Sequence, residues 1–221
     1  MNEKLAKTSI IIPAYGNLEL TKKCVASIIS MTSYPDFEII LIDNDSGEEF
    51  QDFFKNFDSG KIKFIYLKNN KNLGFSKANN QGVKIASSEI LVFLNNDTEV
   101  IEQNWLKNLT SPLLKNSEIG LTGAKLLYPD NTIQHAGIYF YAGRPKHLYK
   151  NKQNSLIDSN INRYLNAVTA ACISIKKELF LSIGGFDENF INGWEDLDLC
   201  LRIRKLGKKI LYNSNCVLIH H

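Results

Sequence analysis

Short apolar runs recur through the first hundred residues, and each ends abruptly in polar residues. They lie at positions 9–12, 37–42, 62–67 and 90–94. Runs of this length are too short for free-standing helices, and their β-branched and aromatic residues favour strands buried on both faces. The pattern therefore predicts four strands of a buried sheet.

Helical patterns separate these strands. Apolar residues recur at intervals of four between positions 18 and 30, which is typical of an amphipathic helix. A further helix is predicted at 50–57, and the stretch 72–82 leads into another that runs to about residue 87. Strands that alternate with helices pair in parallel through right-handed crossovers. We therefore expect a Rossmann-like, nucleotide-binding half over the first hundred residues.

The rhythm changes after residue 100. Strands are predicted at 119–127, 132–140, 168–175, 209–212 and 217–221, and helices at 105–114, at 176–183 and up to Gly207. Between them, 143–164 is one long polar stretch, and an unstructured loop of that length is usually functional or disordered. We interpret it as a mobile substrate flap in preference to a featureless insertion.

Polar side chains follow two of the predicted strands at the point where each strand ends. Asp43 comes directly after 37–42, and Asn95, Asn96 and Asp97 follow 90–94. In open parallel sheets, ligands bind beyond the carboxyl ends of the strands, so these residues are candidates for chemistry. The alternative is that they are Asx turns or helix caps. Their recurrence on two strands favours binding.

The amino-acid composition limits the classes of function that are compatible with this chain. Of 221 residues, 44% are hydrophobic, which is ample for one packed domain, and 26 Lys and Arg against 23 Asp and Glu give a net charge of only +3. A nucleic-acid partner is not expected, because no long basic block is present. The four cysteines lack metal-type spacing, and no apolar run is long enough to span a bilayer. We expect a soluble cytoplasmic protein, with peripheral attachment to a membrane left open.

A set of motifs in a particular order carries a family resemblance. The set comprises Ile12-Pro13-Ala14-Tyr15, Ile42-Asp43-Asn44, Asn72-Leu73-Gly74-Phe75, Leu94-Asn95-Asn96-Asp97-Thr98, Gly184-Gly185-Phe186-Asp187, Trp194-Glu195-Asp196 and His220. Over nearly the whole chain it resembles glycosyltransferase family two, of the GT-A fold. The stretches at 126–130 and 134–137 resemble the branch with bacterial rhamnosyltransferases and other builders of surface polysaccharide.

The resemblance implies a fold and an activity. It implies an α/β GT-A domain over 1–221, with a mostly parallel mixed sheet flanked by helices, a nucleotide-sugar-binding half at 1–100 and an acceptor half at 101–221. The implied reaction is inverting transfer of a sugar from a UDP- or dTDP-sugar to a saccharide or lipid-linked acceptor. A divalent metal, Mn²⁺ or Mg²⁺, would assist by holding the diphosphate leaving group.

Metal ligands follow from the same resemblance. Asp97 corresponds to the last residue of the family's D-x-D motif, and His220 to a second ligand, since a neutral imidazole binds Mn²⁺. The first Asp of that motif is replaced here by Asn95, which leaves a single carboxylate. Metal dependence is therefore a point to test. The alternative for His220 is an ordinary terminal histidine, and His135 and His147 are interpreted as surface or acceptor-side residues.

The catalytic residues implied by the resemblance lie at 194–196. Asp196 would take the proton of the acceptor hydroxyl, and Glu195 would hydrogen-bond the acceptor. The alternative is that these carboxylates only complement the positive end of a helix. Trp194 could stack on an acceptor sugar or belong to the core, and the sequence leaves both open.

The nucleotide site is implied in the same way. Asp43 would accept the imide N–H of uracil or thymine, because a carboxylate needs a donor opposite. The other expected contacts are Pro13, Ala14, Tyr15, Asn72, Gly74, Asn80, Asn95 and Asn96.

Two rival functions remain. One is a sugar nucleotidyltransferase, although the first strand lacks a Gly-rich phosphate loop, and the other is a catalytically impaired carbohydrate-binding or scaffold protein. A further interpretation is that the chain is a domain of a longer protein.

Overall fold

The computed structural model describes residues 5–191 and 193–221. The elements of the first half are β1 (Thr8–Ala14), α1 (Leu18–Met31), β2 (Phe37–Asp43), α2 (Glu48–Lys55), β3 (Lys63–Lys68), α3 (Gly74–Ile85), β4 (Ile90–Leu94) and β5 (Thr98–Val100). Those of the second half are α4 (Trp105–Lys115), β6 (Ile119–Leu127), β7 (Ile133–His135), β8 (Ile138–Tyr141), β9 (Arg144–His147), η1 (Ile157–Asn160), β10 (Arg163–Leu165), β11 (Cys172–Lys176), α5 (Lys177–Ser182), α6 (Glu195–Lys205) and β12 (Lys209–His220).

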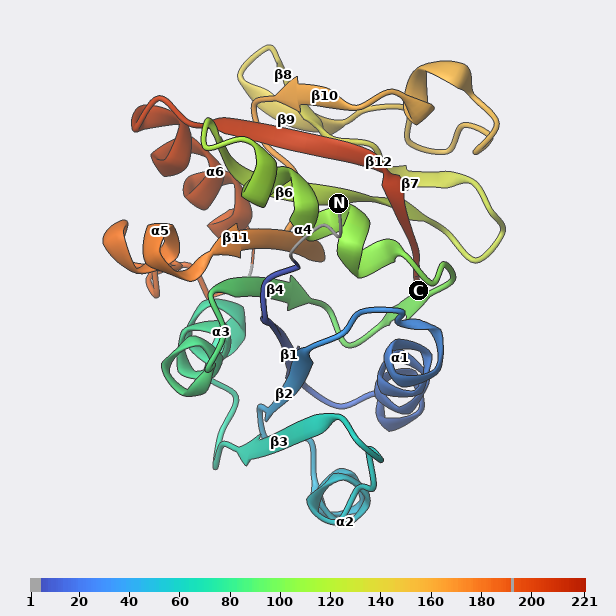
Figure 1. Ribbon diagram of the computed structural model, residues 1–221, viewed down its shortest axis with the longest axis vertical. Coiled ribbons are helices and arrows are strands. Elements are labelled where there is room, and N and C mark those ends of the chain that lie inside the picture. The colour runs from blue at the N-terminus through green and yellow to red at the C-terminus, as the bar shows by residue number, and fades with distance from the viewer. Residues whose placement is uncertain (1–4, 192) are drawn as a thin grey trace.

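One mixed sheet runs through both halves (Figure 1). Its strand order is β10-β12-β6-β11-β4-β1-β2-β3, with β5 paired to β12 and β7 to β6. The pairs β4-β1, β1-β2 and β2-β3 are parallel, as the alternation of strands and helices predicts, whereas β11 runs antiparallel to both β4 and β6. The carboxyl ends of the parallel strands therefore share one edge of the sheet.

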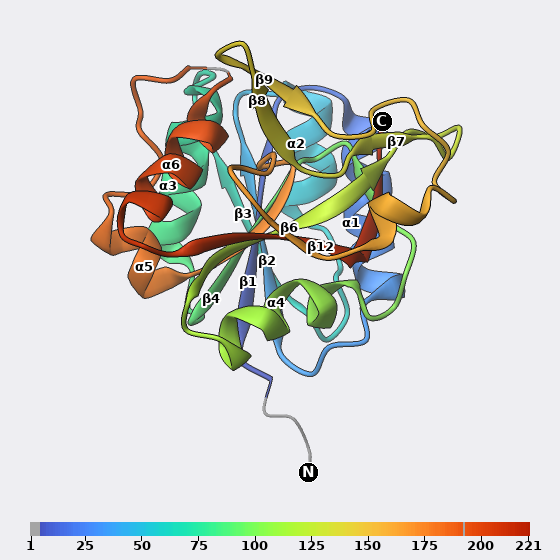
Figure 2. The same cartoon turned by 90° about the horizontal axis from the view of Figure 1, so that it is seen from above.

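The core forms two layers because side chains alternate across the strands. On β1, Ile10 and Ile12 pack with Cys24 and Ile28 of α1, whereas Ile11 faces the opposite layer. Figure 2 shows α3, α5 and α6 on one face of the sheet and α1 and α2 on the other. Since complete burial of such a side chain contributes roughly 1.5–3 kcal/mol, this alternation on a doubly covered sheet holds the strand ends in place.

The predicted elements of the first hundred residues are confirmed, with shifts of at most two residues at their ends, and β5 is a further strand that the pattern did not predict. Beyond residue 100, four expectations need correction. The strand predicted at 132–140 is two strands, β7 and β8, which belong to different sheets. The polar stretch 143–164 is not a long unstructured loop, because it contains β9, η1 and β10. The two short strands predicted near the end form one strand, β12, whose polar break is absorbed by a register shift between Asn213 and Val217. The strand predicted from 168 begins only at Cys172.

Candidate active site

The turns that follow β1, β2 and β4 line a cleft of about 290 Å³, close to the lower end of the range for small-molecule sites. Its lining residues are Pro13, Ala14, Tyr15, Asn44, Asn72, Gly74, Phe75, Asn95, Asn96 and Asp97. Most of the residues that the sequence assigns to the nucleotide are therefore brought together here with Asp97. Tyr15 is 60% exposed, so its ring is free at the cleft.

Gly74 shapes one wall of this cleft. Its φ is +80°, and a Cβ at this position would lie 2.7 Å from the carbonyl oxygen of Ile191. Asn72 Oδ1 accepts a hydrogen bond from the Gly74 N–H at 2.9 Å, at the first residue of α3. A side chain at position 74 is thus excluded on both conformational and steric grounds.

Asp43 lies behind the cleft and does not line it. Its side chain is fully buried, Oδ1 accepts from the Ser46 N–H at 2.7 Å, and Oδ2 accepts from the Tyr66 hydroxyl. Burial and the Asp43 carboxylate raise the pKa of the Tyr66 phenol, which therefore stays protonated and donates. The neighbouring Asn44 reaches the cleft, and its amide donates to the Gly74 carbonyl at 3.2 Å.

Asn80 lies outside the cleft, in contrast to its expected place near the base or ribose. Its Nδ2 donates to the Phe186 carbonyl at 2.9 Å, and its Oδ1 accepts from the Phe186 N–H at 3.1 Å. The side chain also bonds Glu188 and lines a separate depression beside the 184–188 turn. Asn80 therefore fixes that turn to α3.

Asp97 and His220 come together because β5 pairs with the end of β12. Thr98 is opposite His220 in this antiparallel pair, and the His221 N–H donates to the Asp97 carbonyl at 3.0 Å. The His220 Nε2 lies 3.0 Å from Asp97 Oδ1 and 3.3 Å from the Asn95 amide nitrogen. The predicted metal pair is therefore assembled at the cleft from residues 123 positions apart in sequence.

Gln134 selects the tautomer of His220. Its Nε2 donates to the His220 carbonyl at 3.1 Å, which turns its Oε1 towards the His220 Nδ1. An amide oxygen only accepts, so Nδ1 carries the hydrogen and the neutral ring presents an unprotonated Nε2. That lone pair faces both Asp97 Oδ1 and Asn95. A hydrogen bond of this kind, to the ring nitrogen that does not face the metal, orients metal-binding histidines.

These residues fit a divalent cation. Asp97 Oδ1 is buried and has no hydrogen-bond partner among the described residues, and a lone pair of His220 points at it. Two electron-rich atoms at 3.0 Å favour a bridging cation. In the described part of the chain, no group of three or more His, Cys, Asp or Glu side chains could hold a metal. The remaining ligands would have to come from amides, water or the diphosphate itself.

Residues 169–171 connect the cleft to the predicted base. The Asn95 N–H donates to the Ala171 carbonyl at 2.9 Å, and the Ala170 N–H donates to Asp196 Oδ2 at 3.3 Å. The Thr169 N–H donates to the His135 Nε2 at 3.3 Å. Three consecutive residues before β11 therefore hold the tip of β4, the start of α6 and the end of β7.

Glu195 and Asp196 begin α6. Asp196 is partly exposed, and its Oδ1 accepts from the Leu197 N–H at 2.8 Å. Glu195 is buried, and its Oε2 has no hydrogen-bond partner among the described residues. Burial, together with the charge of Asp196, raises the pKa of Glu195. An ionisable oxygen buried without a partner is typical of a site that awaits a ligand.

Trp194 immediately precedes the pair in a rare backbone conformation. Its φ is +76°, which is unfavourable for a large side chain, and 59% of the residue is exposed. The exposure excludes the core alternative left open by the sequence. Strain of this kind persists where the surrounding structure imposes it, often beside binding sites.

The sequence analysis did not assign several residues that shape the site, namely Gln134, Asn44 and residues 169–171. Gln134 stands in a stretch that the family resemblance already singled out, and this was the available signal. Residues 169–171 act through backbone N–H and C=O groups, for which side-chain identity carries no signal. His135, interpreted as a surface or acceptor-side residue, is only 1% exposed and lies inside the acceptor half.

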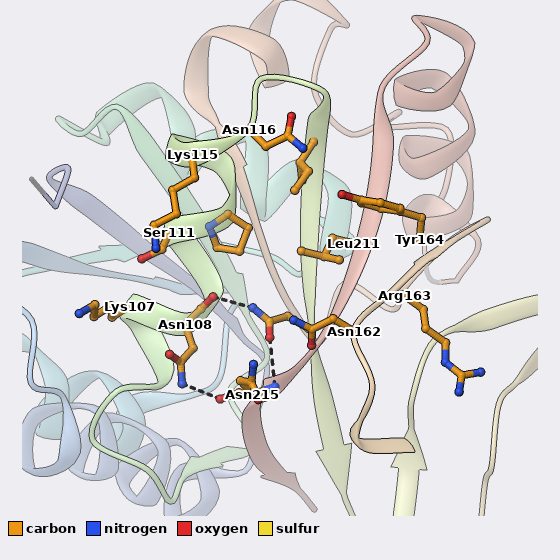
Figure 3. A pocket seen from close by; sticks show the side chains of 13 residues that line it. Lys107, Asn108, Ser111, Lys115, Asn116, Asn162, Arg163, Tyr164, Leu211 and Asn215 are labelled. Atoms are coloured by element: carbon orange, nitrogen blue, oxygen red, sulfur yellow. Dashed lines mark hydrogen bonds between the residues drawn. The ribbon is translucent and has the colours of Figure 1, made fainter. Parts of the chain in front are cut away.

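A second depression, of about 480 Å³, lies between α4 and the β10–β12 edge (Figure 3). Its amides are largely used within the protein: Asn108 Nδ2 donates to the Asn215 carbonyl at 2.6 Å, and Asn213 Nδ2 donates to the Asn108 carbonyl at 2.7 Å. Asn162 Oδ1 accepts from the Ser214 N–H at 2.8 Å. These bonds tie β12 to α4 and to the segment before β10, so we assign the groove a structural role.

Solved structures define the class of this fold. The chain superposes on GalNAc-T7, solved with UDP, GalNAc and Mn²⁺, with a TM-score of 0.79, at 20% identity, over 99% of this chain and 44% of that one. It superposes on the mannosyltransferase PcManGT from Pyrobaculum calidifontis, solved with GDP-Man and Mn²⁺, with a TM-score of 0.73, at 15% identity, over 98% and 57%. The fold is therefore GT-A, as the sequence predicts.

Sequence comparison identifies the family. Residues 9–180 match the family model described as glycosyl transferase family 2, and the chain belongs to that family. It is 34% identical over 225 residues to the O-antigen biosynthesis protein RfbC of Myxococcus xanthus, which covers 97% of this chain. The chain spans only 17% of the length of that relative. None of the helices in the described ranges is both long and apolar enough to cross a membrane.

Proposed function

We propose that this domain catalyses inverting transfer of a sugar from a UDP- or dTDP-sugar to a saccharide or lipid-linked acceptor in surface polysaccharide synthesis. The observation that carries the proposal is the pairing of Asp97 with an Nε2 lone pair of His220 at the strand-tip cleft. A divalent cation bound by these two residues would neutralise the charge that develops on the departing diphosphate. A lipid-linked acceptor would place the reaction at the cytoplasmic face of a membrane.

Asp196 has the geometry of a general base in this reaction. Two backbone N–H groups, of Leu197 and Ala170, fix one carboxylate oxygen each, and every such oxygen retains a further lone pair. In a single displacement, the acceptor oxygen bonds to the anomeric carbon while the bond from that carbon to the diphosphate breaks on the opposite face. The hydroxyl proton passes to Asp196.

Glu195 and Trp194 are proposed acceptor contacts. The unpartnered Oε2 of Glu195 can accept from an acceptor hydroxyl, or donate when protonated, because its pKa is raised. The exposed ring of Trp194 offers an apolar face on which a sugar ring can stack. Both residues directly precede Asp196 in sequence, and we propose that they contact the same acceptor.

The preference for a pyrimidine rests on Asp43. Each of its oxygens already accepts one bond and keeps capacity for a second, but the carboxylate is buried behind Tyr66, so the imide N–H of uracil or thymine reaches it only when Tyr66 moves aside. Pro13, Ala14 and Tyr15 supply the adjoining cleft wall. A base presenting only acceptors at this point would be disfavoured.

A catalytically impaired, carbohydrate-binding role is the second candidate, and Asn95 is the observation that favours it. The residue replaces a carboxylate, and its amide nitrogen lies 3.3 Å from the same Nε2 that would bind the cation. Rotation of the amide would offer its Oδ1 to a cation instead, which makes Asn95 compatible with a weaker metal site.

Calorimetric titration with UDP, dTDP, GDP and ADP, each with and without Mn²⁺, tests the proposal. We expect a pyrimidine diphosphate to bind more tightly than the purine diphosphates, and only with Mn²⁺. Asp97→Ala should abolish the effect of Mn²⁺, so that its affinity for nucleotide with Mn²⁺ equals that of the wild type without metal. Failure of all four nucleotides to bind would favour the impaired alternative, and tight binding without metal would contradict the role of Asp97.

A further inference from the structure

Two histidines outside the donor cleft form a directly bonded pair. The Nδ1 atoms of His135, at the end of β7, and His147, at the end of β9, lie 2.8 Å apart, with ring centroids 4.9 Å apart and planes at 77°. His135 is 1% exposed, whereas His147 is exposed. One imidazole is therefore held inside the protein and the other is presented to solvent.

Backbone geometry selects the tautomers of both rings. The Thr169 N–H donates to the His135 Nε2 at 3.3 Å, so this nitrogen is an acceptor and the hydrogen of the neutral ring is on Nδ1. His135 Nδ1–H then donates to the His147 Nδ1. The hydrogen of His147 must therefore be on Nε2, for which no hydrogen-bond partner is found among the described residues.

Neutral rings are required for this arrangement. Burial lowers the pKa of His135 well below its usual value, and the charges of His147 and His220 act in the same direction. Partial burial and Lys150 lower the pKa of His147, while Asp196 opposes this shift. Because both rings stay uncharged near neutral pH, the direction of the chain of hydrogen bonds is fixed.

The pair is anchored beside the predicted base. Thr169 and Ala170 are consecutive, and their N–H groups bond His135 and Asp196 respectively. The hairpin that carries His147 is held by bonds from the Ile138 N–H to the Ala167 carbonyl and from the Leu148 N–H to the Gly137 carbonyl, both at 2.9 Å.

Gly137, at the start of the hairpin, has a φ of +102°, which favours glycine, and a Cβ at this position would meet the Leu165 side chain. A side chain at position 137 is therefore disfavoured next to the histidine pair.

We propose that His147, held by His135 as an Nε2–H donor beside Asp196, binds the acceptor sugar through an oxygen next to the reacting hydroxyl. This assignment rests on the proposed function. A carboxylate that accepts from one hydroxyl and an N–H that donates to its neighbour together recognise a saccharide with two adjacent hydroxyls. His147 is then an acceptor-binding residue, and His135 is a positioning residue that acts through it.

The tautomers can be tested without any acceptor. Nitrogen-15 NMR of the histidine rings at pH 7.5 should show His135 protonated on Nδ1 and His147 on Nε2. Thr169→Pro removes the N–H that bonds His135, so in this variant both rings should become mixtures of the two tautomers. Thr169→Ala, which keeps the N–H, serves as the matched control. Finding His147 as the Nδ1–H tautomer, or as an imidazolium, would overturn the proposal.

The binding role is tested by His147→Ala and His147→Gln, because the Gln amide nitrogen replaces the Nε2–H donor. Ligand-observed NMR with methyl glycosides of glucose, galactose, mannose and rhamnose, with UDP and Mn²⁺ present, supplies the probes. We expect at least one glycoside to bind the wild type. His147→Ala, which loses one hydrogen bond, should lower the affinity for that glycoside about tenfold, and the affinity of His147→Gln should stay within about threefold of the wild type.

The outcomes separate this inference from the proposed function. The affinity for UDP in the presence of Mn²⁺ should be the same in all three proteins. If the wild type did not bind UDP, that result would count against the donor site and not against His147. Wild-type protein that binds UDP but no glycoside, or His147→Ala that binds glycosides like the wild type, would overturn the role of His147. Thermal unfolding of the variants checks that the exposed position tolerates both changes.

Discussion

The donor side and the acceptor side of this site are built differently. On the donor side, β1, β2 and β4 end at one edge, and each contributes the residues that follow it directly in sequence. On the acceptor side, Asp196 is held by a backbone N–H from 170, and the nearby histidines come from two strands of different sheets.

The two sides differ in how their residues are positioned, by strand ends on the donor side and by hydrogen bonds between distant segments on the acceptor side. A parallel sheet delivers strand-end residues to one edge wherever the strands are buried, so the donor side follows from the fold itself. The acceptor side depends on hydrogen bonds between distant segments, so it can vary without disturbing the sheet. Variants on the two sides should therefore separate donor binding from transfer.

The largest effect is expected from Asp196→Asn. The change removes the proton acceptor while keeping the shape of the side chain, so we expect the rate of transfer to fall by roughly 10²–10⁴-fold. Affinity for UDP with Mn²⁺ should not change, because Asp196 lies on the acceptor side. Single-turnover transfer assays and calorimetry measure the two quantities.

Asp198→Asn is the matched control for that variant. Asp198 lies on the same first turn of α6 but pairs with Arg202 at 2.7 Å, so its loss should leave transfer near the wild-type rate. Equal rates for Asp196→Asn and the wild type would remove Asp196 from the mechanism.

A pH-dependent effect on stability should come from Glu38, at the amino end of β2 and so at the edge of the sheet opposite the donor cleft. The side chain is fully buried; burial by itself would raise its pKa, but bonds from Lys63, Ser9 and Ser87 outweigh burial and lower the pKa from 4.5 to about 2. A lowered carboxyl pKa stabilises the fold fully above pH 4.5, and this contribution disappears as the pH falls towards 2.

Glu38→Gln should remove this contribution, about 3 kcal/mol at pH 7, and flatten the acid limb of the stability curve. Urea unfolding between pH 7 and pH 3 measures it. Glu49→Gln, at an exposed position on α2, is the matched control for the loss of one negative charge. A parallel acid limb in Glu38→Gln and wild type would show that Glu38 does not cause it.

A smaller effect is expected from Gln134→Met. Loss of the hydrogen bond to the His220 Nδ1 should free the ring to rotate and weaken Mn²⁺ binding by roughly 10–100-fold. Mn²⁺ titration in the presence of UDP, followed by electron paramagnetic resonance, measures the affinity directly. Gln134→Glu keeps an acceptor towards Nδ1 and should retain more of it. Identical Mn²⁺ affinity in all three proteins would exclude a role for Gln134.

The smallest change in stability is expected from Trp194→Gly. Glycine adopts a φ of +76° without strain, so folding should gain about 1 kcal/mol, while loss of the exposed ring lowers affinity for the acceptor. Chemical denaturation and transfer kinetics report the two effects. A less stable variant would mean that the ring packs against the fold, and unchanged kinetics would mean that it does not touch the acceptor.

Much of the donor side could be predicted from the sequence. Apolar runs at 9–12 and 90–94 determine buried strands because hydrophobic periodicity acts over a few residues, and polar residues directly after a parallel strand reach the ligand edge. Asp97 and Tyr15 lie in the cleft for this reason, whereas Gly74 lines it from the start of α3. The pairing of Asp97 with His220 came from the family resemblance, and the β5–β12 ladder provides its geometry.

Only the tertiary structure decided which partners the polar side chains meet. Asp43 and Asn80 look in the sequence like their neighbours in the cleft, yet one is covered by Tyr66 and the other bonds Phe186. The tautomers of His220 and His147 depend on Gln134 and on the N–H of residue 169, which lie far away in sequence. Hydrophobic periodicity specifies where a strand lies, but a hydrogen bond is specified by atoms that only the packed chain brings within 3 Å or so.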